Sequence, residues 1–304
     1  MKNILLTFIT ALTATILFSG CHKTDLTASY IYIDSAAIYI NMANYNQIHG
    51  TNYDAEELAS IASQRFSDAW IFVDGQDLGT WEIPCRIPIL GSDSAEIKIY
   101  PGFKMNGSST TRPRYPFVDP YTFHLPLLKG EVQTFTSIPV TYTSTSKYEF
   151  IETFNTDYNG IFHTNIENGI NFEHIIDPDN SSNRIGKLAL TDTVTEFELV
   201  SNGMSFQHVL PTYAFLEMDY RCDIENAQLS VGVLVEKTNT TIITNEPLVI
   251  ANAGSQWKKI YINLTQAIAR NQTYARNFRI QITGGRADNN PVNFYFDNIK
   301  VIYQ

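Results

Sequence analysis

The chain has 304 residues, of which 44% are hydrophobic and 17% charged, and its formal net charge is −10. This length suffices for two domains with apolar cores of their own. The negative charge and the lack of any run of basic residues argue against nucleic acid as a partner, because phosphate backbones are repelled by such a surface.

The N-terminus has the features of a secretory signal. Lys2 precedes an apolar run over residues 4–18, and the small residues Ser19 and Gly20 follow. The run is shorter than the about 20 residues that a membrane-spanning helix needs. We therefore expect residues 1–20 to be a signal peptide that is cleaved.

Cys21 comes directly after these small residues, and the stretch LFSGC resembles the lipobox of bacterial lipoproteins, although Phe18 stands where leucine is most common. In that family the cysteine thiol receives a diacylglycerol and the new amine is acylated. The resemblance implies that an acylated Cys21 anchors the chain to a lipid membrane, since several acyl chains together give stable anchoring. The alternative is a buried or disulfide-bonded cysteine that happens to follow a signal peptide.

Alternating apolar and polar residues recur along the rest of the chain. The runs are rich in aromatic and β-branched residues and are bounded by Gly, Pro, Asn and Asp, which is the pattern of half-buried strands. Clear examples are SYIYIDSAAIYI, DAWIFVD, AEIKIYPG, FLEMDYRCDI, LSVGVLVEK, KKIYINLT, FRIQITGG and VNFYFDNIKVIY. We predict an all-β protein built from two β-sandwich domains.

Two stretches favour helix instead. Residues 53–66 carry Leu58, Ile61 and Ala62 at helical spacing with acidic residues in the first turn, and LTQAIARNQT has room for one or two turns. The first would be a short helical insertion in the first domain. A cluster of Ser, Thr and Lys in TYTSTSKYEF indicates a linker, so we predict domains over residues 26–143 and 147–304.

In the first domain, Asp74-Gly75 predicts a tight hairpin, because a type I′ turn needs positive φ. Pro84 and Pro88 exclude a central strand, and GSDSAEIKIYPG favours a loop that leads into an edge strand. This order resembles PEGA-type β-sandwiches of bacterial envelope proteins. The block from DAWIFVDG to VDPY also resembles uncharacterised Bacteroidota-type surface lipoproteins, which implies the outer membrane, at the cell surface rather than its periplasmic face.

The second domain opens with EFIETF and closes with NFYFDNIKVIY, and QWKKIYINL lies between them. These motifs resemble the galactose-binding-like jelly roll of many carbohydrate-binding modules, in which the first and last strands lie side by side. The resemblance implies a structural calcium held by Glu152 and Asp297, and hard oxygen ligands suit that ion. The alternative is that Asp297 caps a turn or is solvated.

The same resemblance implies non-covalent binding of a glycan or a related polymer through the second domain. Sugar rings stack on exposed aromatic faces, and the candidates by residue type are Trp257, Tyr261, Tyr213 and Tyr274. Core packing is the alternative for each of them, since KKIYINL and PTYAFLEM are strands with one buried face. A structural or fimbria-like assembly role at the cell surface is the second functional hypothesis.

No zinc motif, nucleophile elbow or phosphate loop occurs in the sequence, so we predict no enzyme; a glycosidase-like activity is the minor alternative. Cys85 and Cys222 could form a disulfide, but we expect two buried free thiols. Asp-Ser/Thr-apolar triplets resemble O-glycosylation acceptors of the same bacteria. Of the copies at Ser35, Ser94 and Thr193, we expect only Ser94 to lie in a loop.

Overall fold

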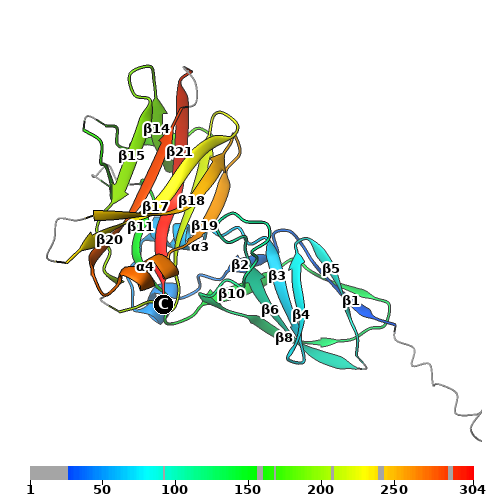
Figure 1. Ribbon diagram of the computed structural model, residues 1–304. Coiled ribbons are helices and arrows are strands. Elements are labelled where there is room, and N and C mark those ends of the chain that lie inside the picture. Colours follow the sequence, from blue (N-terminus) through cyan, green and yellow to red (C-terminus); the bar gives the residue numbers. More distant parts are fainter. Residues whose placement is uncertain are drawn as a thin grey trace, which may run out of the picture.

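The computed structural model describes residues 27–91, 93–155, 160–167, 169–206, 209–238, 243–286 and 290–304. Residues 1–20, the expected signal peptide, and Cys21 lie outside these ranges. Within them the chain is mainly β, with two β-sandwich domains and three short helices, which confirms the predicted class (Figure 1). No helix in the described ranges is long and apolar enough to cross a membrane.

The first domain contains three small sheets, with strand orders β4-β3-β6-β8, β5-β1-β9 and β2-β10-β7. Their inward side chains form one core, in which Ile31, Ile87 and Ile97 are fully buried. The elements are β1 (Ser29–Ile33), β2 (Ile38–Ile40), α2 (Tyr45–His49), α3 (Ala55–Ala62), β3 (Asp68–Val73), β4 (Gln76–Glu82), β5 (Cys85–Ile89), β6 (Ser94–Gly102), β7 (Val118–Asp119), β8 (Tyr121–Pro126), β9 (Val132–Phe135) and β10 (Ile138–Tyr142).

Two short motifs in this domain form the local structures that the sequence predicts. Asp74 and Gly75 have φ values of 49° and 78°, the positive values of the expected type I′ turn between β3 and β4. Asp54 caps α3: its carboxylate accepts from Glu57 N at 2.8 Å, and the Glu57 carboxylate accepts from Asp54 N at 2.9 Å. The helix of residues 53–66 is therefore real, although shorter than expected.

The edge position expected for the strand in GSDSAEIKIYPG is wrong. This strand is β6, which pairs with β3 on one side and β8 on the other. Its Ile97 and Ile99 are fully buried, and Pro101 is tolerated because it lies near the end of the strand. β5, which contains Pro88, is an edge strand as expected, because it pairs only with β1 in its sheet.

The second domain is a sandwich of two larger sheets around one core. One has the order β13-β14-β21-β16-β19 with β11 also paired to β21, and the other has the order β12-β15-β20-β17-β18. β11 and β21, the first and last strands, lie side by side as the jelly-roll resemblance implied. The elements are β11 (Lys147–Glu152), β12 (Phe162–Thr164), β13 (Glu173–Asp177), β14 (Asn180–Leu190), β15 (Glu196–Ser201), β16 (Ala214–Cys222), β17 (Ala227–Lys237), β18 (Ile243–Ala253), β19 (Lys258–Asn263), α4 (Thr265–Asn271), β20 (Ala275–Gly285) and β21 (Val292–Tyr303).

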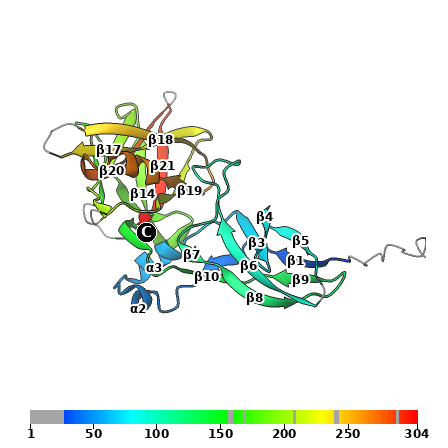
Figure 2. The ribbon, with the colours of Figure 1, turned by 60° about the horizontal axis from the view of Figure 1, so that its bottom comes forward.

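The two domains pack directly on each other. Phe215, Tyr261 and Ile302 of the second domain are at most 3% exposed and belong to the core of the first, where Phe103 meets the Tyr261 ring at 4.9 Å between centroids. Helix α3 packs against β11, so the insertion of the first domain lies at the junction (Figure 2). The connection at residues 143–146 therefore joins two domains that form a packed interface with each other.

Cys85 and Cys222 are both buried and form no disulfide, as expected. Each lies in a different domain core, where burial raises the pKa of each thiol to about 11. Both cysteines therefore contribute to core packing as small apolar side chains.

Candidate functional site

The outer face of the six-stranded sheet carries polar and charged side chains, and several of them are buried instead of being exposed to solvent. In β21, Phe294 and Phe296 point into the core and are fully buried, so Tyr295 and Asp297 point outward. β16 follows the same alternation. Asn298, with φ of 51°, lies at a bulge that moves the outward positions of β21 to Lys300 and Ile302.

The register of β21, β16 and β19 aligns the outward side chains in three rows. We name them the aromatic row, the aspartate row and the buried row, in order from the open end of the sheet to the first domain. In this order they contain Tyr295, Arg221 and Trp257; Asp297, Asp219 and Lys259; and Lys300, Glu217 and Tyr261.

The aromatic row is held together by the Arg221 guanidinium. Its Cζ atom lies 5.1 Å from the centroid of the Trp257 ring and 4.6 Å from that of Tyr295, within the range of cation–π attraction. Arg221 also forms ion pairs with Asp179 at 3.3 Å and Asp177 at 4.0 Å, both from the β13–β14 hairpin. Four segments thus fix the orientation of two half-exposed aromatic rings.

The aspartate row lines a recess between the domains. Asp219 accepts hydrogen bonds from Asn298 Nδ2 at 2.9 Å, from Ser63 Oγ at 3.2 Å and from Lys259 Nζ at 3.3 Å. Asp297 is 9% exposed, and burial raises the pKa of its carboxyl to about 6. This aspartate recess has a volume of about 280 Å³ and is lined by Ser63, Gln64, Arg65, Asp177, Asp219, Trp257, Lys259 and Asp297.

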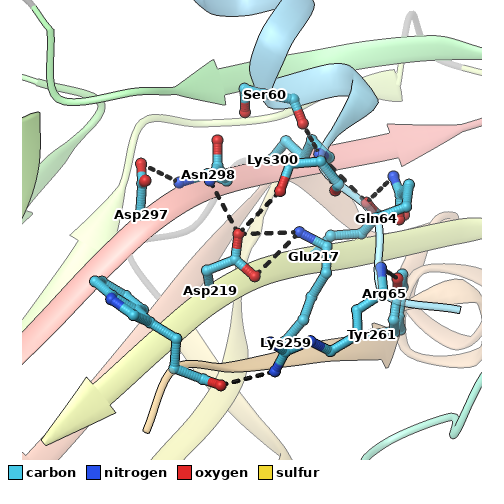
Figure 3. Close-up of polar contacts among 12 residues, drawn as sticks. Ser60, Gln64, Arg65, Glu217, Asp219, Lys259, Tyr261, Asp297, Asn298 and Lys300 are labelled. Atoms are coloured by element: carbon cyan, nitrogen blue, oxygen red, sulfur yellow. Dashed lines mark hydrogen bonds and ion pairs between the residues drawn. The ribbon is translucent and has the colours of Figure 1, made fainter. Parts of the chain in front are cut away.

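The buried row fixes the segment of the first domain that forms one wall of this recess (Figure 3). Lys300 and Glu217 are fully buried, with 3.6 Å between Nζ and Oε2. Lys300 donates to the carbonyls of Ser60 and Ser63, and Glu217 accepts from Gln64 Nε2 at 2.9 Å. Burial lowers the pKa of Lys300 to about 7. The end of α3 is thereby attached to the sheet.

The structure separates the four aromatic residues that the sequence proposed as ligands. Trp257 lines the aspartate recess, but Tyr261 is 2% exposed and its hydroxyl accepts from Arg65 N at 2.8 Å. Tyr213 is 42% and Tyr274 65% exposed, and neither lines that recess. Tyr213 precedes β16, whereas Trp257 lies beside the opposite end of that strand. The Tyr274 carbonyl accepts a hydrogen bond from Thr238 N, just after β17 of the other sheet.

Several residues of the site were missed at the sequence level. Arg221, Asp219 and Tyr295 were noted only as members of alternating strands. Alternation alone shows that Asp219 and Arg221 share a face of LEMDYRC, and that Tyr295 and Asp297 share a face of FYFDN. What joins the two pairs is strand pairing between positions about 80 residues apart in sequence, which no local signal gives.

Glu152 and Asp297, the expected calcium ligands, have separate partners. The two oxygens of Glu152 accept from Phe154 N at 2.9 Å and Ile161 N at 3.0 Å, and Asp297 accepts from Asn183 Nδ2 at 2.9 Å. In the described part of the chain, no three His, Cys, Asp or Glu side chains form a group that could hold a metal ion. The two carboxylates thus have different protein partners, and a structural calcium held by Glu152 and Asp297 stays a prediction.

The three acceptor triplets do not lie as expected. Ser94 is exposed but is the first residue of β6, whereas Ser35 and Thr193 lie in exposed turns. Location outside a strand would thus favour Ser35 and Thr193 over Ser94 as acceptors. O-glycosylation at Ser94 stays a prediction, as does lipidation of Cys21, which is outside the described residues.

A larger hollow of about 730 Å³ lies on the other sheet of the second domain. Glu196, Glu198 and Glu225 line it, but its one aromatic residue, Phe197, is 1% exposed. It therefore offers hydrogen-bond acceptors without a ring on which a sugar could stack, and the aspartate recess is the better candidate site.

No model of a known protein family matches the sequence, and no curated protein matches it. Solved structures similar to this chain include a carbohydrate-binding module of the β-sandwich superfamily, at 13% identity and a TM-score of 0.39, covering 77% of this chain and 84% of that one. Another is the xylan-binding CBM22-1 domain of Paenibacillus barcinonensis Xyn10C, at 7% identity and a TM-score of 0.38, covering 52% of this chain and 95% of that one. Both TM-scores lie below 0.5, so these likenesses identify neither a family nor a ligand for this chain.

Proposed function

We propose that the second domain binds a glycan non-covalently at the aspartate recess and does not catalyse a reaction on it. The observation that carries this proposal is the half-exposed Trp257 ring at the rim of a recess whose floor holds Asp219 and Asp297. An apolar ring face and carboxylate acceptors are the two kinds of group that a sugar needs, because its C–H face is apolar and its edge carries hydroxyl donors.

The groups are also held in place before any ligand arrives. Arg221 fixes the Trp257 ring, and Asn298, Ser63 and Lys259 fix the Asp219 carboxylate. A ligand that meets ordered groups loses less free energy to side-chain ordering. The Tyr295 ring, which also packs on Arg221, extends the aromatic face beyond the recess, which suits a segment of a polymer rather than an enclosed small molecule.

We further propose that an acylated Cys21 anchors this binding domain to the outer membrane, with the protein facing the cell surface. The support is the lipobox-like stretch LFSGC and the apolar run before it. A binding domain on a lipid anchor would hold polysaccharide near the cell. Protease treatment of intact cells checks the orientation, since a periplasmic protein would be spared.

The binding test uses the chain from His22 onward, which removes the lipid anchor, on a glycan array and then by affinity electrophoresis. Trp257→Ala removes the ring at the recess, and Tyr274→Ala removes an exposed tyrosine outside it. Loss of one aromatic anchor of a binding site costs about 2 kcal/mol, or roughly thirtyfold in affinity. We expect that loss for Trp257→Ala and unchanged affinity for Tyr274→Ala.

Three results would contradict the proposal in whole or in part. Equal binding by wild type and Trp257→Ala would show that the recess is not the site. Absence of binding to every polysaccharide on the array would favour the structural or assembly role instead. Release of reducing ends from a bound polymer would refute the non-catalytic part, and would require a search for the two carboxylates of a glycosidase.

A further inference from the structure

A second recess adjoins the first and has the opposite charge. It has a volume of about 440 Å³ and lies between the loop after β6 and the β18–β19 region. Arg65 and Lys259 line both recesses, so the two adjoin at these residues. We name it the basic recess; it is lined by Arg65, Ser67, Lys104, Asn106, Gly107, Tyr220, Ile250, Ala251, Asn252, Lys258, Lys259, Ile260 and Tyr261.

Four of these lining residues are cationic and none is acidic. This composition stands out in a chain that has 21 basic and 31 acidic residues. Cations around a hollow raise the local potential and concentrate anions there where no carboxylate neutralises them, because field lines focus in a recess. The basic recess is thus a local exception to the negative surface.

The partners of these cations leave net positive charge in the hollow. Lys104 pairs with Glu82 at 3.0 Å and Lys259 with Asp219 at 3.3 Å. Arg65 Nη1 instead donates to the carbonyl of Trp257 at 2.7 Å, and Lys258 Nζ donates to that of Asn252 at 2.9 Å. Neither Arg65 nor Lys258 forms an ion pair within 4.0 Å in the ranges that the structure describes, so their two charges are not neutralised at contact distance.

We propose that the basic recess receives the anionic substituent of an acidic glycan whose neighbouring sugar stacks on Trp257; this rests on the function proposed above. The hydrogen bond from Arg65 to the Trp257 carbonyl places a guanidinium directly beside the stacking residue. Carboxylate and sulfate groups both suit a guanidinium and an ammonium group. The ligand class is therefore an anionic polysaccharide, in which the charge comes from a uronate or from a sulfate ester.

The test compares polymers that differ only in charge. Polygalacturonate is compared with its methyl ester, which removes the carboxylate charge, and chondroitin sulfate with chemically desulfated chondroitin, which removes the sulfate and keeps the uronate. We expect the more highly charged member of at least one pair to bind at least tenfold more tightly. The pair that shows the difference identifies the source of the anion.

Lys258→Gln removes one charge of the basic recess, and Lys129→Gln removes one exposed lysine in the first domain that lines neither recess. We expect Lys258→Gln to weaken binding of the preferred, more highly charged polymer about fivefold and to have a smaller effect on its less charged partner, with no effect of Lys129→Gln. The affinity of wild type for the charged polymer should also fall as salt rises from 0.05 to 0.5 M, because counterions screen the attraction between the polymer and the basic recess.

The outcomes separate this inference from the function on which it rests. Equal affinity for the more and the less charged polymer of both pairs, with Trp257→Ala still weakening binding of each, would refute the anionic class and leave glycan binding intact. An equal effect of Lys258→Gln and Lys129→Gln would show a general charge effect and would also refute it. Absence of binding to all four polymers and to the array would overturn both proposals.

Discussion

Lys300 offers the sharpest test of how the recess is built. It is fully buried, it faces Glu217 at 3.6 Å between Nζ and Oε2, and it donates to the carbonyls of Ser60 and Ser63 at the end of α3. Lys300→Met keeps an unbranched apolar stem and removes the charge and all three contacts. The Glu217 carboxylate would then be a buried anion without a cation.

Removal of one partner from a buried ion pair costs about 3–5 kcal/mol, because the remaining charge stays out of water. Glu217 keeps donors in Tyr115 and Gln64, and the variant no longer buries a charged amine, so the expected loss lies below this range, at about 2 kcal/mol. Since Lys300 holds α3, the variant should also bind glycan more weakly, as Ser63 and Arg65 line the recess.

The assay is urea unfolding at pH 6, followed by tryptophan fluorescence, because burial lowers the pKa of Lys300 to about 7 and the amine is charged below that value. A double variant, Lys300→Met with Glu217→Gln, removes both charges of the pair. We expect it to recover about 2 kcal/mol relative to Lys300→Met alone, since no uncompensated charge then stays buried. A loss below about 1 kcal/mol for Lys300→Met, with an unchanged dependence on urea, would refute the reasoning.

The same group sets a pH dependence. The Lys300 pKa falls from 10.5 in the unfolded chain to about 7 in the folded one. Between these values the unfolded chain binds more protons, so this contribution to the free energy of unfolding rises from about pH 7 to pH 10. Lys300→Met should show a flatter dependence across this window, and an identical slope in the two proteins would contradict the assignment.

The remaining predictions concern the thiols, one glycine and the anchor. Burial raises the pKa of Cys85 and Cys222 to about 11, so both should react with a thiol reagent at pH 8 only after denaturation; rapid reaction of the native chain would contradict their burial. A Cβ atom at Gly186 would lie 2.4 Å from the buried Phe154 ring, so Gly186→Ala should lower the free energy of unfolding by about 1–3 kcal/mol, with Gly285→Ala, whose nearest neighbour would be 3.4 Å away, as control. Cys21→Ala should abolish labelling by an alkyne fatty acid, and equal labelling of both proteins would refute the lipid anchor.

The sequence by itself determined the features that depend on near neighbours. The alternation of apolar residues identified the strands and therefore the all-β class, because successive side chains of a strand point to opposite faces. Asp74-Gly75 located a turn, and the acidic residues after Tyr53 located the start of α3. Each of these outcomes depends on interactions within a few residues.

Pairing between distant strands lies beyond such signals. The stretch GSDSAEIKIYPG favours a loop that leads into an edge strand, but β6 is central because β3 and β8 both supply partners and Pro101 lies near its end. The aromatic row likewise comes from β16, β21 and the residue before β19. Register sets which side chains meet across strands, and a shift by one residue would turn each of them to the opposite face.

Trp257 and Tyr261 show most clearly what only the tertiary structure decided. They are four residues apart, so alternation places both on the same outer face of the sheet, and the sequence treated them as equal candidates. The first domain covers that face as far as Tyr261, which is 2% exposed, and leaves Trp257 at the rim of the recess. A strand pattern reports which face a side chain occupies, whereas the extent to which another domain covers that face depends on contacts such as Arg65 N with the Tyr261 hydroxyl, 196 residues apart in the chain.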